Sequence, residues 1–219
     1  MNLRALPLVL GFLPVSPIAA QVPRYLGGDL GISWPQFQSA SPGGGAKLSG
    51  LVAGGRLRVD LRPVSFELSY SQGRLAADTG GAPARDIVEG SLFLTARPLP
   101  WLALKAGPHL RAYAAPGGTE RWVLWEGRAH ADAPIIEGQW LAYGEVWVAV
   151  ASSVNVSSGA SGARGAEAGL TLKLPQSPKL LQSPLWVRLA YVVDQARLKN
   201  NAGTESLQSV VLAIGLGGR

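Results

Sequence analysis

Few side chains in this 219-residue chain could perform acid–base or metal chemistry. Its histidines are His109 and His130, and the absence of cysteine excludes a thiol nucleophile, a disulfide and a cysteine-bound metal. His130 and Asp132 lie two positions apart, which places both side chains on one face of an extended strand. A structural histidine, hydrogen-bonded to a neighbouring carboxylate, explains this pair better than a catalytic couple does.

No other motif for catalysis or ligand binding is complete. The sequence contains no HExxH and no EF-hand loop, and the glycines at 43–45 lack the spacing and the following helix of a P-loop. We therefore expect no enzyme, no cofactor and no metal site.

The composition narrows the class of protein further. Hydrophobic residues make up 47% of the chain and charged residues 16%, which excludes an intrinsically disordered protein. The formal net charge is +6, but basic residues alternate with acidic ones instead of gathering in one helix or stripe. We therefore expect no nucleic-acid partner.

The first twenty residues have the pattern of a cleaved secretory signal. Arg4 precedes a leucine-rich apolar run, and the segment ends on the small pair Ala19-Ala20. A membrane anchor is disfavoured, because prolines interrupt a stretch that is already too short to span a bilayer. Residues 21–219 are then predicted to form a single domain.

Hydrophobicity in the rest of the chain alternates with a period of two, which is typical of β-strands, and no segment has the helical period. We predict an all-β protein with ten strands, and an eight-stranded count is the alternative if two of them are loop hairpins. The predicted strands cover 25–34, 46–61, 65–73, 86–97, 101–113, 120–132, 136–152, 165–174, 185–195 and 204–216.

Each predicted strand has one apolar face and one face that carries charges of both signs. The apolar faces are free of charge except at Lys47 and Arg121, which lie at strand ends. A soluble barrel or sandwich would bury the apolar faces, whereas a membrane barrel would turn them to lipid and keep the charges in its lumen.

Four features favour the membrane barrel: the predicted export of the chain, the length of the strands, the alternating lengths of the connections, and the aromatic residues on the apolar faces. The strands cover the roughly 9 to 11 residues that a tilted spanning strand needs. Tight links near 63, 97–100 and 132–135 alternate with longer ones at 35–45, 74–85 and 153–164 and with shorter polar ones at 114–119 and 196–203; the ten-residue link 175–184 is the exception. Aromatic residues on the apolar faces predict an interfacial girdle of Trp34, Tyr70, Trp125 and Trp140.

On this pattern, residues 25–216 resemble the small outer-membrane β-barrels of bacteria. The resemblance implies an up-and-down, antiparallel transmembrane barrel in the bacterial outer membrane, inserted by the barrel-insertion machinery and surrounded by lipid and lipopolysaccharide. The charged faces then predict a lumen network of Arg56, Arg58, Asp60, Glu67, Glu89, Arg97, Lys105, Arg111, Glu126, Arg128, Glu137, Glu145, Glu167, Lys173, Arg188 and Asp194. Cations expected in loops, which could attract lipopolysaccharide, are Lys47, Arg74, Arg85, Arg164, Arg197 and Lys199.

The function predicted on this basis is an integral barrel of structural or unknown role, with a charge-paired and largely plugged lumen. Alternatives that stay open are a narrow, porin-like channel, a surface-binding or adhesion protein that acts through its loops, and a lipid-modifying barrel enzyme. A secreted soluble β-barrel also remains, since Gly138-Gln139-Trp140 matches the short Gly-x-Trp of lipocalins.

Overall fold

The structure, a computed structural model, describes residues 25–42, 44–61, 63–77, 82–156, 159–174 and 184–217. The signal predicted over residues 1–20 lies outside this part of the chain. Within the described residues no helix is long and apolar enough to cross a membrane, and the one short helix is η2 (Lys199–Asn201).

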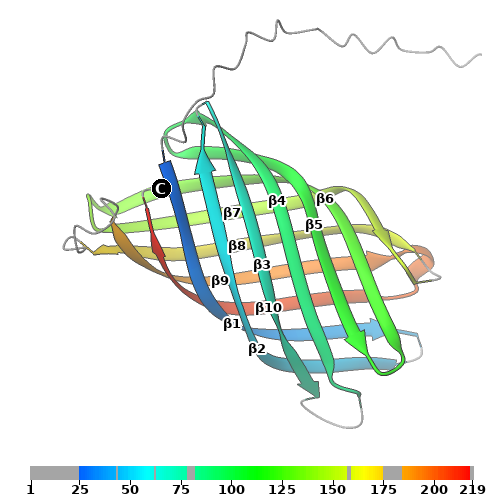
Figure 1. Cartoon of the computed structure of the whole chain (residues 1–219). Helices are drawn as coiled ribbons and strands as arrows, with labels where there is room; N and C mark the ends of the chain where they lie inside the picture. The colour runs from blue at the N-terminus through cyan, green and yellow to red at the C-terminus, as the bar shows by residue number, and fades with distance from the viewer. Residues whose placement is uncertain are drawn as a thin grey trace, which may run out of the picture.

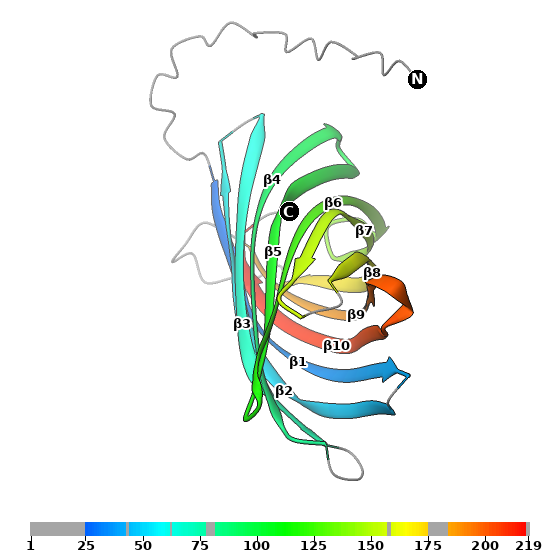
Figure 2. The same cartoon turned by 90° about the vertical axis from the view of Figure 1, so that its right-hand side faces the viewer.

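The chain forms a closed barrel of ten antiparallel strands, so the predicted fold class is confirmed and the eight-stranded alternative is wrong. Each strand pairs with the next along the chain, and the first pairs with the last to close the barrel (Figures 1 and 2). The strands are β1 (Tyr25–Ser41), β2 (Gly44–Asp60), β3 (Val64–Ala77), β4 (Arg85–Leu99), β5 (Leu102–Ala115), β6 (Gly118–Ile136), β7 (Trp140–Val154), β8 (Ala160–Leu174), β9 (Leu185–Leu198) and β10 (Thr204–Leu216).

We call the end of the barrel where β1 begins and β10 ends the terminal end, and the opposite end the distal end (Figure 1). The connections at the two ends do not alternate between short and long as the sequence predicted. Two residues separate β1 from β2, and two separate β5 from β6, so two of the distal connections are as short as a tight hairpin. Several segments expected to be loops belong to strands instead.

The reason for this error is a reversal of polarity along β1. Trp34 points outward, but Gln36 and Gln38, which share its face, are polar and exposed, while Phe37 points inward and is 0% exposed. The alternation therefore continues through 35–41 with its apolar and polar faces exchanged. In the sequence, a polar residue beside an apolar one, next to Pro35, has the local pattern of the start of a loop.

The outer wall between the terminal end and this reversal is apolar on all ten strands, and we call it the apolar belt. Its exposed side chains include Leu30, Ile32, Trp34, Leu57, Leu68, Tyr70, Leu92, Leu94, Leu104, Leu110, Trp125, Val146, Val148, Leu170, Leu189, Tyr191, Val210, Leu212 and Ile214. The strands are 13 to 19 residues long, so they are longer than the 9 to 11 or so that a bilayer crossing requires. The additional strand residues lie at the distal end.

Beyond the belt, the barrel interior is filled by an apolar cluster that we call the distal core. It contains Phe37, Leu48, Val52, Leu75, Ile87, Tyr113, Trp122, Leu124, Ala160, Ala163, Ala196 and Leu207. Full burial of each large apolar side chain contributes about 1.5–3 kcal/mol. The distal part of the barrel is thus built like a soluble protein, with apolar side chains inside and polar ones outside.

Aromatic side chains on the lumen wall lie against glycines of the neighbouring strand. A Cβ atom at these glycines would collide with the ring, so the absence of a side chain is what admits each aromatic group. The pairs are Tyr143 with Gly169, Trp147 with Gly165, and Trp186 with Gly215. These contacts fix the rings against the wall and leave the middle of the lumen to charged side chains.

Candidate functional site

The lumen between the terminal end and the distal core holds the charged side chains of the predicted network. Arg56, Arg58 and Asp60 come from β2, Glu67 from β3, Glu89 and Arg97 from β4, Lys105 and Arg111 from β5, Glu126 and Arg128 from β6, Glu145 from β7, Glu167 and Lys173 from β8, and Arg188 and Asp194 from β9. The strand pairing places them on the inward face of the barrel, opposite the apolar belt.

Lys47, Arg74, Arg164 and Arg197, which the sequence predicted in loops, lie instead in β2, β3, β8 and β9. Two further predictions, for Glu137 and Arg85, are wrong about the lumen. Glu137 is not in the lumen, because β6 extends to Ile136 and places Glu137 in the exposed turn before β7. Arg85, expected in a loop, is the first residue of β4 and points inward, where its Nη1 atom lies 3.7 Å from Glu120 Oε2. In both cases an error of a few residues in the end of a strand changed the predicted position of the side chain.

Lys105 ties three strands together near the centre of the network. Its Nζ atom lies 2.9 Å from Glu145 Oε2 on β7 and 3.4 Å from Glu67 Oε1 on β3. Arg56 on β2 lies 3.4 Å from the same Glu67 oxygen. Lys105 is only 9% exposed, so these contacts replace the water that a lysine would otherwise hold.

Arg111 joins opposite sides of the lumen. Its Nη2 atom lies 2.7 Å from Asp194 Oδ2 on β9, and its Nε atom lies 2.5 Å from Glu89 Oε1 on β4. Charge-assisted bonds of this length are among the strong hydrogen bonds of proteins. These two contacts therefore connect β4, β5 and β9 across the lumen, next to the distal core.

Arg128 is held by two carboxylates and two aromatic rings. Its guanidinium donates to Glu126 and Glu145, and its Cζ atom lies 4.4 Å from the ring centre of Phe93 and 4.8 Å from that of Trp147. Cation–π contacts of this kind add to ion pairing where water is excluded. Arg188 is held more loosely, at 3.8 Å from Glu167 and 3.9 Å from Asp29.

Each histidine lies between two carboxylates. His109 Nδ1 lies 2.9 Å from Glu126 Oε1 and its Nε2 lies 3.6 Å from Glu89 Oε1, while His130 has Glu145 at one ring nitrogen and Asp132 at the other. The predicted His130–Asp132 contact is present, at 2.9 Å.

Most ion pairs of the lumen form one connected set. The carboxylates of this connected set are Asp29, Glu67, Glu89, Glu126, Asp132, Glu145, Glu167 and Asp194, and its basic side chains are Arg56, Arg97, Lys105, Arg111, Arg128, Arg188, His109 and His130. Each carboxylate of the set faces at least one basic side chain, which suits a narrow lumen in which an unpaired charge is costly. Within the described residues there is no cluster of three or more histidines and acids placed to hold a metal ion.

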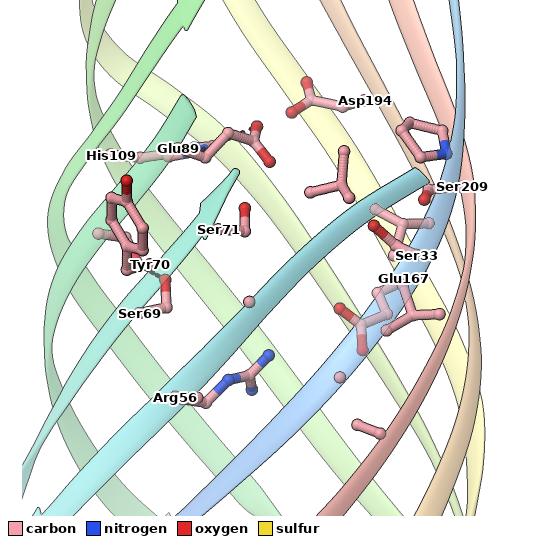
Figure 3. Close-up of a pocket in the computed structure, with 18 of the residues that line it drawn as sticks. Ser33, Arg56, Ser69, Tyr70, Ser71, Glu89, His109, Glu167, Asp194 and Ser209 are labelled. Carbon is pink, nitrogen blue, oxygen red and sulfur yellow. Dashed lines mark hydrogen bonds and ion pairs between the residues drawn. The ribbon is translucent and has the colours of Figure 1, made fainter. Parts of the chain in front are cut away.

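A cavity of about 210 Å³ lies beside the network, and we call it the chamber. Its walls come from the charged side chains on one hand and from small residues of β10, β1, β2 and β3 on the other. Figure 3 shows Arg56, Glu89, Glu167 and Asp194 directed from different strands into this space, with Ser33, Ser69, Ser71 and Ser209 around it. Val52, Ile87 and Leu207 of the distal core also line it.

Two glutamates face each other across the distal mouth of the barrel. The side chain of Glu205 on β10 faces that of Glu120 on β6, which accepts a 2.8 Å bond from Trp122 Nε1. Burial, and then the neighbouring Glu120 carboxylate, raise the pKa of Glu205 to about 8. These groups lie beyond the apolar belt, where the outward neighbours Thr204 and Ser206 are polar.

The predicted network omitted several inward residues that complete it. Asp29, His109 and Asp132 alternate with apolar residues in the same manner as those that were included, so the period-two pattern could have found them. Glu120, Glu205 and the distal core carry no such signal, because the pattern reverses before it reaches them. The four predicted girdle residues, Trp34, Tyr70, Trp125 and Trp140, all lie exposed on the outer wall, together with Trp101 and Tyr191.

Neither a family model nor a curated protein matches the sequence. Solved structures share the barrel architecture at low identity. The translocator domain of the autotransporter NalP from Neisseria meningitidis is 9% identical, with a TM-score of 0.48, over 89% of this chain and 88% of that one. Ail, the attachment invasion locus protein of Yersinia pestis, is 12% identical, with a TM-score of 0.34, over 87% of this chain and 97% of that one.

The Pseudomonas putida toluene transporter TodX is 8% identical, with a TM-score of 0.35, over 89% of each chain. These proteins are bacterial outer-membrane β-barrels. The predicted resemblance to that class is confirmed at the level of fold, with the closed ten-stranded antiparallel barrel as its basis. The three matches assign no role to this chain.

The Glu120–Glu205 contact predicts a pH dependence of stability. The folded-state pKa of Glu205 is raised from 4.5 to about 8, so the folded protein binds more protons than the unfolded chain between these values, and the free energy of unfolding falls as pH rises through that range. Glu205→Gln should match the wild type at pH 4 and exceed its stability at pH 9 by about 1 kcal/mol or more, the value of a one-unit shift. The thermal midpoint of the tryptophan near-UV signal measures this.

Asp86→Asn, at an exposed carboxyl group of the same rim, is the matched control and should leave the pH dependence as it is in the wild type. Parallel pH profiles for Glu205→Gln and the wild type would show that no proton is shared across the mouth.

Proposed function

We propose that the protein is an integral barrel of the bacterial outer membrane, with a closed lumen and a structural rather than catalytic role. The observation that carries the proposal is the apolar belt, to which all ten strands contribute exposed side chains. Soluble monomers rarely expose a contiguous apolar patch of more than a few hundred Å². A belt that encircles the molecule is stable only where hydrocarbon covers it, which argues against the secreted soluble barrel.

Two tyrosines support this placement in a membrane, because they mark the distal edge of the belt. The Tyr70 hydroxyl donates to Gln72 Oε1 at 2.9 Å, and the Tyr191 hydroxyl donates to Gln208 Oε1 at 2.8 Å. Each ring lies on the apolar side of the edge and each hydroxyl on the polar side, as expected of tyrosines at a membrane interface. Trp101 and Trp140 provide aromatic rings at the terminal end.

The membrane placement predicts a difference between the two faces of the wall. Leu94→Arg and Leu189→Arg put a cation on the belt, where it costs about 2–4 kcal/mol at the bilayer midplane. Ser71→Arg, the matched control, puts the same side chain into the chamber, which has room for it. We expect the first two variants to lose the heat-modifiable, SDS-resistant form recovered from outer membranes, and the control to keep it.

Equal recovery of all three variants, or a wild type that fractionates as a soluble periplasmic protein without detergent, would contradict the membrane placement.

The proposal of a closed lumen is based on two barriers in series along the barrel. The ion-paired network crosses the barrel between β3, β5, β7 and β9, and the distal core fills the interior above it with apolar side chains. Barrels of about eight strands are just wide enough for side chains to fill them, while aqueous channels appear at 16–18 strands. These barriers favour a plugged barrel over a narrow channel, and the pairing of the lumen carboxylates favours a structural role over a lipid-modifying enzyme.

A plugged lumen predicts little or no steady conductance when the purified protein is inserted into planar bilayers. Phe37→Ala together with Trp122→Ala removes bulk from the distal core but leaves the network in place, so we expect this variant to stay closed as well. Stable, reproducible single-channel steps from the wild type would instead establish the narrow channel.

A set of outward cations supports a location in the outer leaflet, with the distal end at the cell surface. Lys47, Arg74, Arg121, Arg164 and Arg197 are exposed on the outer wall of the distal part, and we call them the collar. Asp86, the strand partner of Arg74, is the one acid on that wall among the described residues. The outer wall at the terminal end carries no charge in the same part of the chain.

The position of the collar fits the phosphate groups of lipopolysaccharide. Arg74 lies two residues beyond Gln72, which marks the belt edge, so it stands about 7 Å further along the strand. Each cation close to an anionic lipid surface contributes about 1 kcal/mol to the attraction. We include in the proposal assembly by the barrel-insertion machinery, as the fold class implies.

The collar predicts that lipopolysaccharide stabilises the wild-type barrel. Added to the barrel in neutral detergent, it should raise the thermal midpoint, while a variant with all five collar residues changed to glutamine should show a much smaller rise. Dephosphorylated lipopolysaccharide is the control ligand and should have little effect on either protein. An equal rise for wild type and variant would overturn the role of the collar.

A further inference from the structure

The five cations of the collar are not evenly distributed around the barrel. Lys47 lies on β2, Arg164 on β8 and Arg197 on β9, and these strands belong to the run β8, β9, β10, β1 and β2, which includes the closing contact between β1 and β10 (Figure 2). We call this run the seam sector. Among the residues that the structure describes, its outer wall carries no acid, whereas Arg74 on β3 is paired with Asp86 on β4.

One row of paired residues crosses the outer wall of the whole seam sector. The strand register pairs Lys47 with Gln38, and Gln38 with Ser206 across the closing contact. It continues from Ser206 to Gln195, and from Gln195 to Arg164. We call these five residues the seam row, which spans four strand spacings, or about 19 Å. The row has a cation at each end, and two amides and a hydroxyl between the cations.

The seam row lies just beyond the edge of the apolar belt. That edge is marked by Gln208, which accepts the 2.8 Å bond from Tyr191 and is paired with Gln36 across the closing contact. Ser206 is two residues beyond Gln208, so the row stands about 7 Å further along the strands. In the proposed membrane this is the depth of the lipid headgroups, and Arg197, which is two residues beyond Gln195, adds a third cation there.

The side chains of the seam row are accessible and have no partner in the protein. Lys47, Gln38, Gln195 and Arg164 are exposed, and Ser206 is partly exposed. Among the described residues, no side chain forms a hydrogen bond or an ion pair with any of the five. An amide group both donates and accepts hydrogen bonds. A ligand on this wall could therefore bond to the row without breaking a contact within the barrel.

We propose that the seam row is a binding site for the headgroup of one lipopolysaccharide molecule. The inference rests on the proposed membrane placement, and it assigns one place on the collar to a ligand that the collar as a whole would attract. The lipid-bound part of lipopolysaccharide is a disaccharide with a phosphate at each end and amide-linked acyl chains. Its charges and polar groups follow the same order as those of the row, with charge at both ends and uncharged groups between.

Each part of the site has a defined role in binding. Lys47 holds one phosphate, and Arg164 together with Arg197 holds the other, because their long and flexible side chains can lean over a disaccharide that is shorter than the row. Gln38 and Gln195 form hydrogen bonds with the sugars, and the acyl chains lie against the apolar belt of β9, β10 and β1. The bound molecule thereby links strands on both sides of the closing contact.

The first test compares two pairs of arginines in the full barrel, purified in neutral detergent and titrated with lipopolysaccharide that has a short core. Arg164→Gln with Arg197→Gln changes the seam sector, and Arg74→Gln with Arg121→Gln removes the same charge elsewhere on the collar. Native mass spectrometry counts the bound molecules and gives their affinity. We expect one tightly held molecule on the wild type, and binding at least tenfold weaker, about 1.4 kcal/mol, in the seam pair than in the control pair.

The second test changes the uncharged part of the row. Gln38→Leu with Gln195→Leu removes both amides and leaves the charge as it is, and Thr119→Leu with Ser153→Leu is the matched control on the exposed outer wall of β6 and β7. The amide variant should bind lipopolysaccharide about fivefold more weakly than the control, about 1 kcal/mol. Phosphatidylglycerol, which has a phosphate but no disaccharide, should bind equally and weakly to both. Heat-modifiable mobility shows that each variant is folded.

Three results would overturn the proposal, and they separate its failure from that of the collar. Equal binding to the two arginine variants would overturn the seam site alone and leave a general attraction of lipopolysaccharide to the collar. Equal affinity of the wild type for phosphatidylglycerol and lipopolysaccharide would show that the disaccharide is not recognised. Absence of lipopolysaccharide from the folded wild type would overturn both the site and the role of the collar.

Discussion

The exclusion of unpaired charge from low-dielectric surroundings is the constraint on which this barrel depends. It applies twice, because in the proposed membrane the belt faces hydrocarbon, and because the lumen is too narrow to hydrate a row of ions. The alternation of a β-strand satisfies both demands at once, with apolar residues on one side and charged residues on the other. Pairs such as Lys105–Glu145 and Arg111–Asp194 then convert the inward charges into cross-links between distant strands.

Beyond the belt, the same strands place polar residues outside and apolar residues inside. There the outer wall is polar and the interior is the distal core, so a single continuous sheet has the polarity of a membrane barrel in one part and of a soluble protein in the other. The reversal needs no break in the strand, because only the residue types exchange faces, as Trp34, Gln36 and Phe37 show. The collar and the Glu120–Glu205 contact both lie on the distal side of this reversal.

The period-two pattern was sufficient to predict ten strands, their antiparallel order and the inward position of the charges, because each belt strand has one strictly apolar face. It was insufficient where polarity reverses: Gln36 and Gln38 resemble loop residues in isolation, and a buried Phe37 has no counterpart in a pattern that puts apolar residues outside. Which charges pair across the lumen also depends on barrel closure and register, as Arg111 and Asp194 show, and the sequence alone does not report these.

Spin-label accessibility on β1 tests the polarity reversal most directly, and the lack of native cysteine makes single labels straightforward. Ile32→Cys and Gln36→Cys lie on one face of the strand, four residues apart, on opposite sides of the reversal. In lipid bilayers, a label at 32 should collide with dissolved oxygen and not with a water-soluble nickel chelate, and a label at 36 should show the opposite preference. Lipid accessibility at both positions, or water accessibility at both, would contradict a reversal between them.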